Sequence, residues 1–147
     1  MNLSPNFILP VTLGGTVEEV SAQCYEAEIN EFEELEGFID IEALEPGDEG
    51  RKIVCRIEDD RCVTVTMAYL EAPITDTFLG LDLNGDSGAE EGFVEKLRAQ
   101  GISAIAQFDG VVLPDHFMVI ELGESVTWWD EDYWGKDGFL EEAVALQ

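Results

Sequence analysis

Apolar and polar positions in residues 7–37 follow two different periods. FILPVTLGG reads as a short strand, and its proline favours a sheet edge because proline has no N–H to donate to a ladder. Thr16 followed by Glu19 fits a capping box, and apolar residues then recur at helical spacing. This pattern predicts a helix from about Val17, with Gly37 as its natural stop, although the alternation in YEAEI also fits a strand.

A hairpin is the clearest prediction in the middle of the chain. FIDIEAL reads as a strand, and KIVCRI and RCVTVTMAYL read as a hairpin around EDD. If all of EDD forms the turn, Cys55 faces Val63, whereas a two-residue turn sets Cys55 against Thr64. We favour the first register because it gathers the apolar residues, and it puts Cys55 and Cys62 on opposite faces, where they do not bridge. The predicted apolar face consists of Ile53, Cys55, Val63, Val65 and Met67.

The second half of the chain predicts another helix and another hairpin. Ser87 and Glu90 mark the start of the helix, and Gly101 marks its end. ISAIAQF and VVLPDHFMVIEL flank the turn signal Asp109-Gly110. The tail WWDEDYWGKDGFLEEAVALQ predicts an aromatic and acidic loop and then a short helix. The buried stripe of the first of these helices is predicted to be Phe93, Val94 and Leu97.

Strands, a helix and hairpins in this order indicate an α+β fold. We expect a single acidic α+β domain over residues 1–147, with a mainly antiparallel sheet of about five or six strands and two or three helices. A chain of 147 residues buries about two thirds of its unfolded surface. Its hydrophobic content of 46% argues against disorder.

The charge of the chain restricts its partners. There are 33 Asp and Glu against 7 Lys and Arg, a formal net charge of -26, and residues 1–50 hold 13 acids with no Lys or Arg. Such a field repels nucleic acid and anionic membrane and attracts basic protein surfaces. We therefore expect no direct binding of nucleic acid or membrane, and a basic protein as partner.

The cysteines predict a reduced, intracellular protein. Cys24, Cys55 and Cys62 are an odd count without a CxxC pair, and with a single histidine they form neither a disulfide framework nor a zinc site. The N-terminus has no basic region before its apolar run, and no stretch approaches the roughly 18 apolar residues of a membrane span. We expect a cytoplasmic location.

One segment resembles the beginning of a calcium loop. Asp82, Asn84 and Asp86 alternate as oxygen ligands do there, but the sixth position is Ser87 instead of Gly and the twelfth is Phe93 instead of Glu. A polar turn that is capped into the following helix explains the same residues. We expect no metal and no cofactor, and these three residues are weak candidates only.

No residue pattern favours an enzyme. His116 is predicted to lie in a strand beside Asp115, and no nucleophile motif such as GxSxG accompanies it. Paired carboxylates are too frequent in this chain for any one pair to indicate a glycosidase. We expect no catalytic residues.

Two acidic segments are candidate partner-binding surfaces. EINEFEELEG holds five glutamates whose helical neighbours repel one another. TWWDEDYWG places acids beside Trp and Tyr, which dominate binding hot spots, although the rings also suit the closure of a core. The predicted contact residues are Glu28, Glu31, Glu33, Glu34, Glu36, Trp129, Asp130, Glu131, Asp132 and Trp134.

These features favour a non-enzymatic inhibitor that offers carboxylates, in place of phosphates, to a basic nuclease or nucleic-acid-binding effector. Two settings share this physics: an anti-CRISPR or anti-restriction protein of a phage or mobile element, and an immunity protein against a nuclease toxin. The alternatives are a halophile-type acidic protein of other function and a calcium-binding module. Glu exceeds Asp by 21 to 12, whereas halophile proteins typically favour Asp. The sequence leaves the oligomeric state open.

Overall fold

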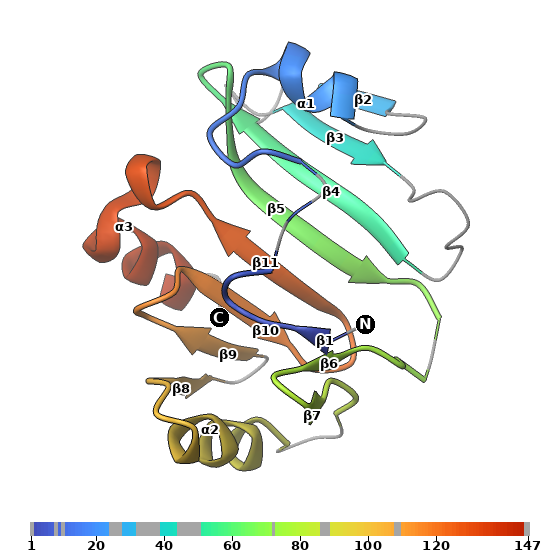
Figure 1. Cartoon of the computed structure of the whole chain (residues 1–147). Coiled ribbons are helices and arrows are strands. Elements are labelled where there is room, and N and C mark those ends of the chain that lie inside the picture. Colours follow the sequence, from blue (N-terminus) through green and yellow to red (C-terminus); the bar gives the residue numbers. More distant parts are fainter. Residues whose placement is uncertain are drawn as a thin grey trace.

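The computed structural model describes residues 2–7, 9, 11–23, 28–31, 39–43, 51–71, 73–85, 89–107 and 110–145, with the backbone alone at 28–31, 39–43, 51 and 144–145. Three helices and two sheets form within these ranges, so the predicted α+β class is confirmed. Helices α1 and α2 lie near opposite ends of the molecule, with α3 to one side (Figure 1). Their bounds are Val17–Gln23 for α1, Ala89–Ala99 for α2 and Glu131–Ala145 for α3.

The main sheet is antiparallel at every described pairing, in the order β2-β3-β4-β5-β11-β10-β9-β8. The short strands β2 and β8 form its two described edges, outside a central group of six. The strands are β2 (Glu28–Glu31), β3 (Ile39–Ala43), β4 (Arg51–Glu58), β5 (Arg61–Tyr69), β8 (Ile105–Gln107), β9 (Gly110–Leu113), β10 (Met118–Glu121) and β11 (Ser125–Trp129).

The N-terminal segment covers the main sheet instead of joining its ladder. A small sheet forms from β1 (Asn2–Leu3), β6 (Thr77–Phe78) and β7 (Leu81–Asp82). The strand predicted at FILPVTLGG is wrong for its described residues, none of which is in a strand. The reason is that their apolar side chains pack on the sheet: Val11 is buried, and Phe7 stacks on Trp128 with ring centroids 6.1 Å apart.

The predicted capping box at Thr16 and Glu19 is confirmed. The Glu19 N–H donates to Thr16 Oγ1 at 3.2 Å, and the Thr16 N–H donates to Glu19 Oε1 at 3.3 Å. The helix that follows is described as far as Gln23, and it does not extend to Gly37 as predicted, because Glu28–Glu31 form strand β2. Of the two alternatives for this segment, the strand therefore holds for Glu28–Glu31.

The turn of the β4–β5 hairpin has two residues, Asp59 and Asp60, with φ of 53° and 56°. Type I′ hairpin turns need positive φ at both positions, and Asp tolerates this conformation better than most residues. The three-residue turn that the sequence favoured is therefore wrong.

A bulge in the same hairpin changes which residues share a face. The register shifts next to Arg56, so that Cys55 pairs with Val65 and neither predicted partner is correct. As a result Cys55 and Cys62 lie in one core cluster, as buried free thiols, and not on opposite faces. Val63 is buried but lies outside that cluster.

Helix α2 follows the sequence prediction, with Phe93, Val94 and Leu97 buried, and β8 and β9 form the predicted hairpin. Gly110, however, is not a turn residue as predicted, since it begins β9 and pairs with Gln107. The segment VVLPDHFMVIEL is not one strand, however. It divides into β9 and β10 at a turn over residues 114–117, where the His116 N–H donates to the Leu113 carbonyl at 3.2 Å and Phe117 has φ of 52°. His116 is therefore an exposed turn residue.

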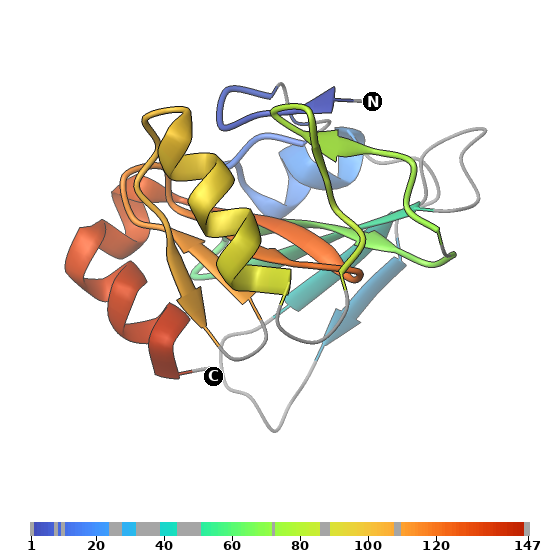
Figure 2. The ribbon, with the colours of Figure 1, turned by 90° about the horizontal axis from the view of Figure 1, so that it is seen from below.

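The tail differs from the predicted loop and short helix. Trp128 and Trp129 end strand β11, and α3 begins directly after Asp130, with a kink at Gly135, where φ is 65°. Successive residues of the central strands face two separate cores. Seen along its edge, the sheet carries α1, the N-terminal segment and the small sheet on one side, while α3 packs against a second cluster that contains Trp129 and Phe139 (Figure 2).

Candidate functional site

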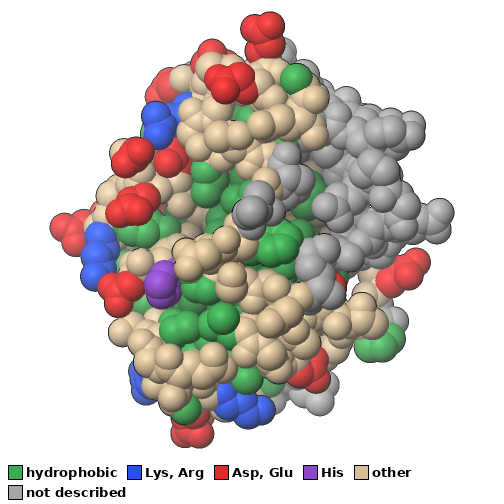
Figure 3. Space-filling model, viewed as in Figure 1, with side chains coloured by type: hydrophobic (Ala, Val, Ile, Leu, Met, Phe, Trp, Pro, Cys, Tyr) green, Lys and Arg blue, Asp and Glu red, His purple; other side chains and the backbone are tan. Residues whose placement is uncertain are grey.

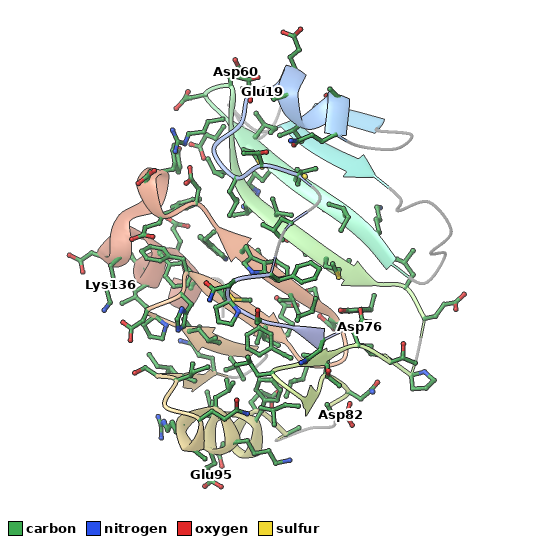
Figure 4. All side chains as sticks on the ribbon, viewed as in Figure 1. Glu19, Asp60, Asp76, Asp82, Glu95 and Lys136 are labelled. Carbon is green, nitrogen blue, oxygen red and sulfur yellow. The ribbon has the colours of Figure 1, made fainter. Side chains whose placement is uncertain are left out.

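Acidic side chains from three separate elements lie close together: the first turn of α1, the turn of the β4–β5 hairpin and the first turn of α3. We call this group the acidic hairpin surface. Asp60 and Glu19 lie near each other there (Figure 4), and red side chains follow this margin of the space-filling view (Figure 3). Six of the seven residues are exposed, and Glu58 is half-buried. The surface consists of Glu18, Glu19, Glu58, Asp59, Asp60, Glu131 and Asp132.

Hydrogen bonds fix α1 to the hairpin turn. The Val17 N–H, at the first helical position of α1, donates to Asp60 Oδ1 at 3.1 Å. Glu19 accepts the Thr16 N–H in the capping box. Two carboxylates of the acidic hairpin surface therefore satisfy N–H groups that a helix start leaves without a partner, and this fixes their positions.

The bulge of the hairpin anchors α3. The Val63 carbonyl accepts the Asp130 N–H at 2.9 Å and the indole N–H of Trp134 at 3.0 Å. The Asp130 carbonyl accepts the Trp134 N–H at 3.1 Å, which is the first turn of the helix. The bulge thus brings Glu131 and Asp132, the first residues of α3, to the hairpin turn.

A partly buried ion pair lies beneath this junction. Asp130 is only 6% exposed, and its Oδ2 accepts a bond from Arg61 Nε at 2.5 Å. Arg61 also approaches Asp132, with 3.9 Å between the charged atoms. The backbone passes close to the pair at Gly14, where φ is 85° and a Cβ would lie 3.2 Å from Arg61. The guanidinium therefore turns inward to Asp130, and the pKa of Arg61 is raised by that hydrogen bond and by the carboxylate charge.

The fold places these acids where their charge is tolerated. Glu18 and Glu19 lie in the first turn of α1, and Glu131 and Asp132 lie in the first turn of α3. The N-terminus of a helix carries partial positive charge, which stabilises carboxylates. Two helix N-termini at one edge thus offset part of the repulsion in the acidic hairpin surface.

The pKa of Tyr133 is affected by its position beside the acidic hairpin surface. Burial, and then a hydrogen bond to Glu58, raise the pKa of Tyr133 to about 12, because both favour the neutral phenol. In the unfolded chain the phenol titrates near pH 10. Its contribution to stability is thus complete below about pH 10 and is lost as the pH rises towards 12.

This shift predicts a loss of stability at high pH that depends on Tyr133. Urea unfolding at about pH 9 and about pH 11.5 should show a larger loss of stability for the wild type than for Tyr133→Phe, which has no phenol to ionise. Because the chain has three tyrosines, the difference in tyrosinate absorbance between the wild type and Tyr133→Phe gives the pKa of Tyr133. Equal losses in both proteins would contradict a raised pKa at Tyr133.

The glutamates of EINEFEELEG do not form one helix face. Glu28 and Glu31 belong to strand β2, where Glu28 pairs in register with Glu42 of β3. Residues of one strand face are two positions apart, so the spacing that unites these glutamates on a helix does not apply. Glu33, Glu34 and Glu36 lie outside the described residues.

The structure separates the residues of TWWDEDYWG into interior and surface. Trp129 is 6% exposed and packs against Trp134 and Phe139, with ring centroids 4.9 and 5.1 Å away, and Asp130 is buried in its ion pair. Trp129 and Asp130 therefore stabilise the contact between the sheet and α3. Glu131 and Asp132 remain as surface charges, and Trp134 is half-buried beneath them.

The weak calcium candidates have structural partners where they are described. Asn84 Oδ1 accepts the Ile74 N–H and its amide nitrogen donates to the Ile74 carbonyl, both at 2.7 Å. The backbone N–H and the side-chain amide of Asn84 both donate to Asp82 Oδ1, at 2.8 and 2.9 Å, and these two bonds lower the pKa of Asp82. Asp86 lies outside the described residues, and the described part of the chain holds no group of three or more potential metal ligands.

Sequence reasoning missed most of the acidic hairpin surface. The signals were present, since the capping box and the turn of the hairpin are both rich in acids. What they lack is any indication that these two segments meet each other and the start of α3. No family model, curated protein or solved structure matches the chain. No helix in the described ranges is long and apolar enough to cross a membrane.

Proposed function

We propose that the protein is a non-enzymatic inhibitor whose acidic hairpin surface binds the basic nucleic-acid-binding surface of another protein, such as a nuclease. The observation that carries this is the concentration of seven carboxylates, from three elements, at one junction that backbone hydrogen bonds hold together. Arg61 binds Asp130 and also lies 3.9 Å from Asp132, so it offsets part of this charge. Seven carboxylates still leave the surface strongly negative.

Rigidity supports mimicry of nucleic acid. Phosphates present fixed negative charges, so a mimic benefits when its carboxylates are ordered before binding and lose little conformational entropy on association. Asp60 and Glu19 are held by backbone N–H groups. Glu18, Asp59, Glu131 and Asp132 surround these ordered groups and add charge that steers a basic partner.

The proposed setting is the cytoplasm, where the buried thiols of Cys55 and Cys62 stay reduced. Either of two roles uses the same contact: an anti-CRISPR or anti-restriction protein that blocks a defence nuclease, or an immunity protein that neutralises a nuclease toxin. The partner in both is a protein with a groove lined by Lys and Arg, and neither role needs a cofactor.

The test is affinity capture from bacterial lysate at about 0.1 M and about 0.5 M salt, between which the screening length falls from about 10 Å to roughly 4 Å. We expect one basic nuclease or effector to bind at low salt and to weaken at high salt, and we expect the purified partner to lose nucleic-acid binding when the inhibitor is added. Circular dichroism at 0.1 M salt should show a folded chain. Capture of only a nonspecific set of basic proteins would contradict the proposal. A chain that unfolds at 0.1 M salt would do the same, and either result would favour the alternative of a halophile-type protein, whose acidic surface serves solvation.

A further inference from the structure

A second candidate surface has the opposite character to the acidic hairpin surface. An open groove of about 660 Å³ lies between the loop after α2, the start of β8, the β9–β10 turn and the kink of α3. Lys136 marks its α3 side at the margin of the molecule (Figure 4). We call it the β8 groove. It is lined by Arg98, Gly101, Ile102, Ser103, Ala104, Ile105, Pro114, Asp115 and Lys136.

The β8 groove follows an edge of the main sheet. Strand β8 pairs with β9 on one side, and no described strand pairs with its other side. A free sheet edge presents N–H and C=O groups to which an extended peptide can add a strand. Ile105, at the start of β8, is 42% exposed and is one of two large apolar side chains exposed to this degree in the described part of the chain. The edge therefore offers both backbone pairing and an apolar contact.

The charges of the β8 groove contrast with those of the whole chain. Arg98 and Lys136 are two of only 7 Lys and Arg. Lys136 Nζ bonds Asp115 Oδ1 at 2.9 Å, and this bond keeps the pKa of Asp115 below its ordinary value, so Asp115 is ionised. Two cations and one carboxylate leave the groove with a net positive charge, on a protein whose net charge is -26.

Arg98 is placed to serve a ligand at this edge. One of its nitrogens donates to the Ala104 carbonyl, just before β8, at 3.0 Å. A guanidinium has five N–H donors, so this single bond leaves others for a carboxylate. The guanidinium of Arg98 is therefore held next to the sheet edge, and it contributes a positive charge to the lining of the groove.

We propose that the β8 groove binds an extended segment of a partner protein in which an Asp or Glu side chain lies beside apolar residues. The segment adds a strand to β8, its apolar side chains contact Ile105 and Pro114, and its carboxylate binds Arg98 and Lys136. This contact does not depend on the acidic hairpin surface, and it gives the protein a second interface of opposite charge preference.

A second copy of the chain is a less suitable occupant. Each copy carries the full negative charge, and the repulsion between two copies acts over their whole surfaces. A short segment experiences mainly the charges within a screening length, about 8 Å at 0.15 M salt. In the lining of the groove, Arg98 and Lys136 outnumber the single carboxylate Asp115.

The experiment is an NMR titration of the isotope-labelled full chain with a synthetic octapeptide of alternating valine and glutamate, at 0.15 M salt. We expect amide shifts concentrated at residues 101–107 and near Lys136. Lys136→Gln and Arg98→Gln should each weaken binding by about two- to fivefold, the range for one exposed ion pair. Lys96→Gln removes the same charge from α2 outside the groove and should leave the affinity unchanged.

Several outcomes would overturn the assignment. Equal binding of an octapeptide of alternating valine and lysine would show that charge is not recognised. A loss of affinity in Lys96→Gln as large as in Lys136→Gln would indicate general electrostatics instead of a site. The proposed occupant would also be excluded if millimolar peptide caused no shifts, or caused shifts only outside the groove. Concentration-dependent dimerisation that Lys136→Gln abolishes would exclude it as well. Lys136→Gln decides the outcome if Arg98→Gln disturbs the loop at Ala104.

Discussion

Replacing Trp129 with alanine should lower the free energy of unfolding by about 3–5 kcal/mol, the usual cost of removing a large buried aromatic ring. Trp129 is 6% exposed and lies in the second core cluster, between the sheet and α3. Its ring contacts Trp134 and Phe139, so the variant leaves a cavity beneath the start of α3. Urea unfolding followed by circular dichroism measures the loss.

A matched variant separates packing from polar effects. The indole N–H of Trp129 has no partner among the described residues, so Trp129→Phe gives up ring volume but no hydrogen bond. It should cost clearly less than Trp129→Ala, because fewer buried ring atoms are removed and a smaller cavity is left. If Trp129→Ala unfolded at the wild-type urea concentration, Trp129 would be a surface residue and the partner contact predicted from sequence would regain its basis.

Neutralising three acids of the acidic hairpin surface should weaken binding to a basic partner by about tenfold or more, which corresponds to about 1.4 kcal/mol. The triple variant is Glu18→Gln, Glu131→Gln and Asp132→Asn. These side chains accept no hydrogen bond from the described residues, apart from the long contact between Asp132 and Arg61. Titration calorimetry with the captured partner measures the affinity, and the dependence on salt should also become less steep.

The control triple variant is Glu90→Gln, Glu91→Gln and Glu95→Gln, on α2. It removes the same charge from the molecule and two acids from the first turn of α2, whereas the test variant removes two from the first turn of α3 and one from that of α1. Circular dichroism of both variants checks that the helices stay folded, so that a difference in affinity reports on location. Equal weakening by both variants would mean that total charge, and no particular surface, attracts the partner, and the acidic hairpin surface would lose its role.

Local signals in the sequence predicted local structure well. The capping box at Thr16 and Glu19 and the buried stripe of α2 depend on residues within a turn or two of each other. Their physical causes, N–H groups at a helix start and a period of 3.6 residues, can be read from short windows. The same is true of the α+β class, which follows from the order of such segments.

The register of the β4–β5 hairpin could not be predicted in the same way. The sequence favoured a turn that puts Val63 and Cys55 opposite each other, because that gathers apolar residues. The structure uses a two-residue turn and a bulge, which direct the Val63 carbonyl to Asp130 and Trp134. Partners from a segment more than sixty residues away decide this register, and no short window contains them.

Residues of the same type within one acidic segment also have different roles in the structure. Asp130 and Asp132 are two positions apart, yet Asp130 is buried against Arg61 while the Asp132 side chain is 88% exposed. A pattern of acids gives charge but no burial, because burial depends on which element covers the residue. For the same reason the sequence overestimated the availability of Trp129.

The sequence by itself determined the net charge and the class of fold, because each is a sum over residues or follows from local periods. Only the tertiary structure decided where the charge is concentrated. It joined Glu18, Asp60 and Glu131 at one edge and set Arg98 and Lys136 around a groove at another. The physical reason is that long-range strand register and helix docking minimise the free energy of the whole chain, and residues distant in sequence become neighbours only through that minimum.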